Sequence, residues 1–102
     1  MDIQITARHA KISAATRETV VEKINKVERF IEKITTCHVI VDNEHDDWLV
    51  EVVMQASGRT FSARALSDNL GKSLDDVVAK AQRQIKKANQ KIKSHKGAKP
   101  EL

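Results

Sequence analysis

The chain has 102 residues, enough for one small domain, and 40% of them are hydrophobic, which indicates a globular rather than a disordered protein. Its one cysteine excludes an internal disulfide framework, and no apolar segment approaches the roughly 20 residues that a membrane-spanning helix needs. The net charge of +4 is uneven, because residues 72–99 hold nine basic and two acidic residues whereas residues 1–71 hold nine basic and eleven acidic ones. Such concentrated positive charge is typical of a surface that binds a polyanion.

The first third of the chain predicts a strand and then an amphipathic helix. Residues 2–8 alternate, with Ile3, Ile5 and Ala7 on one face, as in a strand. Residues 12–34 predict a helix with Ser13 as its N-cap and an apolar stripe at spacings of three and four. That stripe comprises Val20, Ile24, Val27, Ile31 and Ile34.

The middle of the chain predicts three more strands, over residues 36–44, 48–56 and 60–66. A polar hairpin loop at 44–47 joins the first two, and Gly58 supplies the next turn because it can take a positive φ. A last helix begins near residue 69, with Asp68 or Asn69 as its cap, and Gly97 and Pro100 prevent its continuation. We therefore expect one domain over residues 1–95 and a flexible tail over residues 96–102.

The predicted order is β-α-β-β-β-α, an α+β fold. The helix between the first two strands is a crossover, so these strands are expected to be parallel, and the later hairpins antiparallel. The result is a four-stranded mixed sheet. Each helix has one apolar face, so both are expected to pack on the same face of the sheet.

Basic residues gather on one side of each predicted helix. On the last helix Lys80, Arg83, Lys87 and Lys91 form a stripe roughly 120° from the apolar stripe, with Lys86 on the far flank. Like charges four residues apart repel one another, and a polyanionic partner would remove that repulsion. The alternative is a solvated face of lysines whose stems lie along apolar surface.

The first helix shows a weaker form of the same charge separation. Lys23, Lys26 and Lys33 fall on one flank, with Arg29 towards the outside. If the helices lie side by side, the two basic flanks can line a shared groove that binds phosphates, with an affinity that falls as salt rises. Only three aromatics occur, which argues against base stacking on single strands and favours recognition of folded RNA by shape and backbone.

Three segments stand out by their order and spacing: ITARHAKIS, RETVVEKINKVERF and KAQRQIKK. Together they resemble the short bacterial ribosome hibernation-promoting factors, also called ribosome-associated inhibitors or sigma-54 modulation proteins. The resemblance implies a fold related to double-stranded-RNA-binding domains. It also implies binding to the small ribosomal subunit at the channel of messenger and transfer RNA, which inhibits translation and preserves idle ribosomes under stress or in stationary phase.

The resemblance carries over to eight basic positions, which it implies contact ribosomal RNA: Lys23, Lys26, Arg29, Lys80, Arg83, Lys86, Lys87 and Lys91. Family members often carry an aromatic residue where this chain has Gly71, which weakens the first turn of the last helix. Long members carry an extra C-terminal dimerisation domain, which we expect this chain to lack, and we expect it to be a monomer off the ribosome. Its single cysteine suits the reducing cytoplasm, where we expect the protein to act.

Other functions have less support in the sequence. The acidic stretch at residues 42–47 around His45 is expected to be a solvated turn rather than a metal site. Cys37 is expected to be a small core residue rather than a reactive thiol, and His9 either an RNA contact or a loop residue. No nucleotide-binding, zinc or nucleophile motif occurs, so we expect no enzyme, no cofactor and no small-molecule substrate. The open alternatives are a general double-stranded RNA-binding protein and a protein-interaction modulator of a transcription factor.

Overall fold

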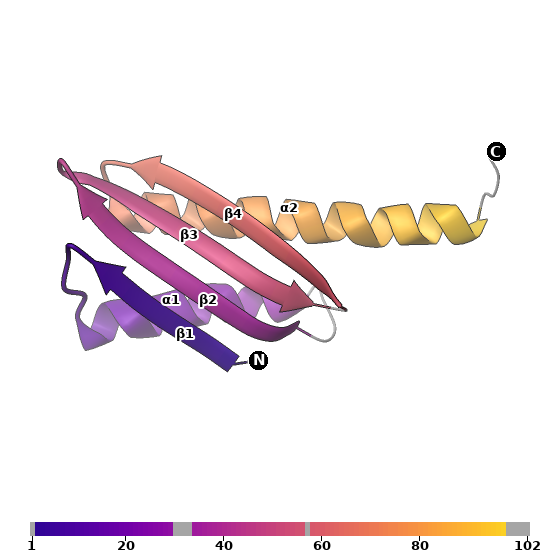
Figure 1. The fold of residues 1–102 in the computed structure, drawn as a ribbon, viewed down its shortest axis with the longest axis horizontal. Helices are drawn as coiled ribbons and strands as arrows, with labels where there is room; N and C mark the ends of the chain where they lie inside the picture. Colours follow the sequence, from indigo (N-terminus) through magenta and orange to yellow (C-terminus); the bar gives the residue numbers. More distant parts are fainter. Residues whose placement is uncertain (1, 30–33, 57, 98–102) are drawn as a thin grey trace.

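The computed structural model describes residues 2–29, 34–56 and 58–97, and for residues 28, 29 and 89–97 it describes the backbone alone. The predicted order β-α-β-β-β-α is confirmed, with one short 3-10 helix added (Figure 1). The elements are β1 (Asp2–Arg8), α1 (Ala14–Asn25), η1 (Lys26–Arg29), β2 (Ile34–Glu44), β3 (Asp47–Ala56), β4 (Arg59–Ser67) and α2 (Leu70–Gly97).

The four strands form one mixed sheet in the order β1-β2-β3-β4. As predicted, β1 pairs parallel with β2, and the other pairs are antiparallel. Both helices lie behind the sheet in Figure 1, with α2 behind β3 and β4 and α1 on the side of β1 and β2. The expectation that both helices cover one face is confirmed.

The core lies between this face of the sheet and the two helices. The alternation of β3 is as predicted, because Val50, Val52 and Met54 are at most 1% exposed. The helices contribute their apolar stripes, and small side chains on β4 allow α2 to approach closely. The buried helical residues of the core include Val20 and Ile24 of α1 and Leu74, Val77, Ala81 and Ile85 of α2.

The predicted first helix is wrong at its C-terminal end. It stops at Asn25, continues as η1 to Arg29, and Ile34 begins β2 instead of ending the helix. Ile34 is buried and pairs with Ala56 of β3. Residues 34–36 are all β-branched, which suits a pleated sheet better than a helix. Ile31 and Lys33 lie outside the described residues.

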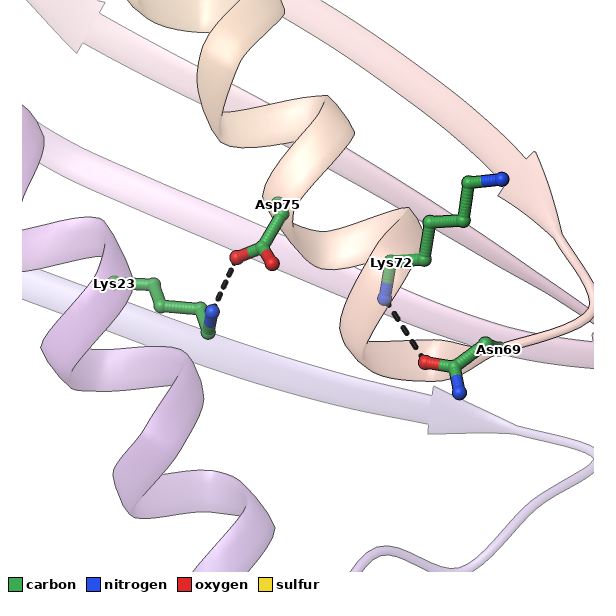
Figure 2. A network of polar contacts seen from close by, with 4 residues as sticks. All are labelled: Lys23, Asn69, Lys72 and Asp75. Atoms are coloured by element: carbon green, nitrogen blue, oxygen red, sulfur yellow. Dashed lines mark hydrogen bonds and ion pairs between the residues drawn. The ribbon is translucent and has the colours of Figure 1, made fainter.

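Both predicted helix caps are present, and the structure decides between the two candidates for α2. The Ser13 hydroxyl accepts a hydrogen bond from the backbone N–H of Thr16 at 3.1 Å. Asn69 caps α2, because its side-chain oxygen accepts from the backbone N–H of Lys72 at 3.0 Å (Figure 2). A Cβ at Gly71 would lie 3.2 Å from this capping oxygen, so the glycine leaves room for the cap.

The first hairpin turn is tighter than the predicted loop. Glu44 pairs with Asp47, so only His45 and Asp46 form the turn, with φ of 50° and 67°. Positive φ at both positions is the geometry that matches the twist of a two-residue hairpin. Gly58 has a φ of 75°, as predicted for the next turn.

The last helix is long for so small a chain. Its 28 residues correspond to about 42 Å of axis, and its C-terminal part continues beyond the end of the sheet in Figure 1. The backbone of Lys96 and Gly97 is helical, and residues 98–102 lie outside the described part, so the expected tail over residues 96–102 stays a prediction. None of the described helices is both long and apolar enough to cross a membrane.

Cys37 is the core residue that the sequence predicted, and its burial gives a pH dependence. Its side chain is 1% exposed, and desolvation raises the pKa of the thiol from 9.0 to about 12. The folded state therefore keeps the proton to higher pH than the unfolded chain. The resulting contribution to the free energy of unfolding is present below about pH 9 and is lost as pH rises from there towards 12.

At about pH 8 we expect a thiol reagent to label Cys37 only after denaturation. Rapid labelling of the folded protein would contradict this assignment.

The two helix caps give a second expectation. Ser13→Ala and Asn69→Ala should each lower the free energy of unfolding by about 1 kcal/mol, because one N-terminal N–H of the helix loses its partner. Ser13→Gly and Asn69→Gly are the controls, and they should cost only a few tenths of a kcal/mol, because a glycine without a Cβ leaves the same N–H open to water. Urea denaturation followed by circular dichroism measures both. Equal losses for the alanine and glycine variants would show that the caps do not act as described.

Candidate nucleic-acid interface

The predicted basic flank of α1 faces α2. The Lys23 ammonium donates a hydrogen bond to a carboxylate oxygen of Asp75 on α2, and this ion pair joins the two helices (Figure 2). The Lys23 side chain is 26% exposed and that of Asp75 is 62% exposed. Lys26 begins η1 three residues later and is exposed. Lys23, the site residue of α1, therefore lies beside an acidic residue of α2.

The opposite flank of α2 faces β4. Lys80 donates from its ammonium to the backbone oxygen of Arg64 at 2.9 Å, and Gln84 donates from its side-chain amide to the backbone oxygen of Ser62 at 2.7 Å. Lys87 is exposed and lies on the same flank, because seven residues make nearly two full helical turns after Lys80. The idea of two basic flanks lining a shared groove is therefore wrong for Lys80, whose flank points away from α1.

The rotation of α2 about its axis follows from what it buries. Leu74 and Val77 point into the core, and Ser73 is fully buried near the start of the helix. The Ser73 hydroxyl donates to the backbone oxygen of Trp48 on β3 at 2.7 Å and lies 2.6 Å from the Ser67 hydroxyl on β4. These contacts fix which residues of α2 face β4, α1 or the solvent.

Arg83 and Lys86 lie on the outward face of α2, between its two flanks. Both are exposed, and with Ala79 and Gln82 they line an open hollow of about 310 Å³. We call Lys80, Arg83, Lys86 and Lys87 the α2 ridge. The ridge follows the helix axis.

Two predicted site residues have no described side chain. Arg29 ends η1, and Lys91 follows Lys87 by one turn of α2, but the placement of both side chains lies outside the described part of the structure. Their backbones put Arg29 three residues after Lys26, at the other end of η1, and Lys91 on the continuation of the α2 ridge.

The ridge is electropositive because the acidic residues of α2 are confined to its beginning. After Asp75 and Asp76 the helix carries only basic and neutral residues up to Gly97. Cations without neighbouring acids attract phosphates strongly, and the affinity falls with salt as condensed counterions are released. The arrangement can therefore bind a polyphosphate along one side of the molecule.

A second polar cluster lies at the ends of β1 and β2. The expected solvated turn is wrong for Asp42, which is 6% exposed and lies within β2. Its carboxylate is 2.9 Å from Nδ1 of His9, whose backbone has a φ of 54°. Glu44 brings a third ligand atom within 4.8 Å, so His9, Asp42 and Glu44 are the described residues that could share a cation. The hydrogen bond from His9 already satisfies the buried Asp42, which makes His9 a structural partner in this cluster.

Comparison with known proteins gives one consistent result. The family described as "Sigma 54 modulation protein / S30EA ribosomal protein" matches residues 3–93. The "Ribosome hibernation promoting factor" of Pseudomonas putida is 31% identical over 94 residues, 92% of each chain. The protein of the same name in Escherichia coli (strain K12) is 26% identical over 95 residues, 93% of this chain and 100% of the relative.

Solved structures show the same fold. A "ribosomal subunit interface protein" from Coxiella burnetii has a TM-score of 0.80 and 28% identity, and the match covers 88% of this chain and 99% of that one. The Thermus thermophilus "Protein Y N-terminal domain" has a TM-score of 0.79, covering 85% of this chain and 98% of that one. Its 19% identity supports likeness of fold alone.

The contacts of α2 with β4 give a testable expectation for this region. β4 is an edge strand, and Lys80 and Gln84 cover two of its backbone carbonyls. Lys80→Ala combined with Gln84→Ala should lower the free energy of unfolding by about 1–2 kcal/mol and promote self-association through the uncovered edge. Denaturant titration and sedimentation velocity measure the two effects.

The matched control changes the same residue types on the outward face of the same helix. Gln82→Ala with Lys86→Ala removes one amide and one ammonium without uncovering β4. It should leave the free energy of unfolding and the oligomeric state unchanged. Equal behaviour of the two double variants would mean that Lys80 and Gln84 do not protect the edge.

Proposed function

The chain belongs to the family described as "Sigma 54 modulation protein / S30EA ribosomal protein", and from that membership we propose that it is a ribosome hibernation factor. It binds the small ribosomal subunit at the channel of messenger and transfer RNA, inhibits translation and preserves inactive ribosomes under stress or in stationary phase. The observation that carries this proposal is the α2 ridge, a row of exposed cations on a helix without opposing acids beyond its second turn. Relatives named as hibernation promoting factors, matched over most of the chain, support it.

The length of α2 supports binding within a channel. The helix continues beyond the sheet (Figure 1), so it can enter a space between RNA segments instead of enclosing a single strand. Of the three aromatics, Trp48 and Phe61 pack against the core. They are not presented as a stacking platform on the helices, so contacts to phosphates and recognition of shape carry the binding.

In the proposed function, the protein binds ribosomes and catalyses no reaction. Three of the side chains that could act as nucleophile or base are engaged or buried in the described structure. Cys37 is a buried thiol whose pKa is raised to about 12, His9 is paired with Asp42, and His38 is hydrogen-bonded to Thr6 at 2.9 Å. A factor of this kind acts in the cytoplasm, needs no cofactor, and is a monomer off the ribosome.

The α2 ridge can be tested by charge reversal. Lys86→Glu with Lys87→Glu should abolish co-sedimentation with small ribosomal subunits in a sucrose gradient, because two phosphate-facing cations become anions. A milder variant, Lys86→Gln with Lys87→Gln, should weaken binding and reduce the slope of log affinity against log salt by about two. Circular dichroism should show unchanged folding, since both side chains are exposed.

The control reverses two exposed charges outside the proposed site. Lys11→Glu with Arg17→Glu changes the net charge by the same amount, on the loop before α1 and on α1 itself. This variant should still co-sediment. If the Lys86 and Lys87 double reversal stays bound to the subunits, the proposed site is wrong.

Competition separates the remaining functions. Transfer RNA should displace the protein from small subunits if it occupies the channel. A general binder of double-stranded RNA would instead bind free duplex RNA as tightly as it binds the subunit. A modulator of a transcription factor would keep its protein partner after the charge reversals on α2.

A further inference from the structure

Asp75 is an acidic residue placed among the proposed RNA contacts. Its carboxylate accepts a hydrogen bond from Lys23, which is one of the eight proposed contacts (Figure 2). A carboxylate oxygen on a lysine ammonium occupies the position that a phosphate oxygen would take when RNA binds. The Asp75 carboxylate and an RNA phosphate therefore cannot both form a full ion pair with the Lys23 ammonium.

We propose that Asp75 is an internal competitor of RNA phosphate and sets the affinity of this surface. While Lys23 is bound to Asp75, it neutralises a protein carboxylate and not a phosphate. Lys23 then exchanges between the two anions, so in the wild-type complex it neutralises a phosphate only part of the time. This inference rests on the proposed function, because it concerns the same surface.

The exposure of the two side chains makes this exchange feasible. Asp75 is 62% exposed, so water can replace the lysine at its carboxylate with little loss. Lys23 is 26% exposed, so most of its aliphatic stem lies against the protein, and the ammonium stands at the tip of that stem. Lys23 can keep its packing and redirect only the charged group to a phosphate.

Asp76 provides the comparison within the same turn. It is exposed like Asp75, but one residue further along a helix turns its side chain by about 100°, away from the flank that contacts α1. Asp75 and Asp76 therefore contribute the same charge to the surface, and the described structure joins only Asp75 to Lys23. Asp76→Asn is thus a matched control for Asp75→Asn.

The experiment measures the affinity of the full chain for small ribosomal subunits between about 50 and 200 mM salt, the range in which phosphate contacts dominate. Asp75→Asn frees Lys23 for one more phosphate, so at the low end binding should tighten about three- to tenfold, and the slope of log affinity against log salt should steepen by roughly 0.7–0.9. Asp76→Asn should leave the slope unchanged, because it adds no phosphate contact.

A further variant ties the effect to Lys23. Lys23→Met keeps most of the buried stem but removes the ammonium, so adding Asp75→Asn to it should give no steeper slope. Thermal unfolding by circular dichroism checks that each variant is folded.

Three outcomes would overturn the inference. Weaker binding by Asp75→Asn would mean that Asp75 positions Lys23 for RNA. Equal slopes for Asp75→Asn and Asp76→Asn would mean that only overall charge matters, and a steeper slope in the double variant would exclude Lys23 as the group released. No binding of the unmodified protein to small subunits would overturn the proposed function itself, and with it this inference.

Discussion

The burial of one face of α2 against β3 and β4 decides where the charges of this protein point. Leu74, Val77, Ala81 and Ile85 enter the core, and the Ser73 hydroxyl binds the backbone of β3. Once these contacts are made, the helix cannot rotate without exposing apolar surface, at about 25 cal/mol per Å², and leaving the buried Ser73 hydroxyl without its partners. The outward direction of Arg83 and Lys86, and the contact of Lys80 with β4, follow from that constraint.

Most of the fold could be predicted because its helices and strands carry local sequence signals. The alternation of Val50, Val52 and Met54 has the period of a strand, and Ser13 and Asn69 are residues that cap helices. The prediction failed at Ile34, where the three- and four-residue spacing of the helix happened to continue into the next strand. The β-branched residues at 34–36 were the local signal that should have ended the helix earlier.

The site could be predicted only in part, because a sequence gives angles within one helix but not the rotation of one helix against another element. The separation of basic and apolar stripes on α2 was visible from spacing alone. The partners of Lys23 and Lys80 were not, since Asp75 lies on another helix and the Arg64 carbonyl on a strand. The pairing of His9 with Asp42 was hidden in the same way. It depends on the parallel register that sets Arg8 opposite Asp42.

These partners divide the proposed contacts into two groups with different consequences. Lys23 and Lys80 sit on the flanks of the helix pair, and each already binds an oxygen of the protein. Arg83 and Lys86, which lie further outward, form the outward group together with Lys87, which lies on the flank of Lys80 but is exposed. A phosphate that meets the outward group displaces only water, whereas one that takes a flank lysine must also replace a protein contact. The outward group is therefore expected to supply most of the affinity. The flank lysines add polar contacts from α2 to α1 and β4, whose arrangement the buried core already sets. The acidic residue at one of those flanks has a place in the same scheme, because its exposed ion pair with Lys23 is weak enough to yield to RNA.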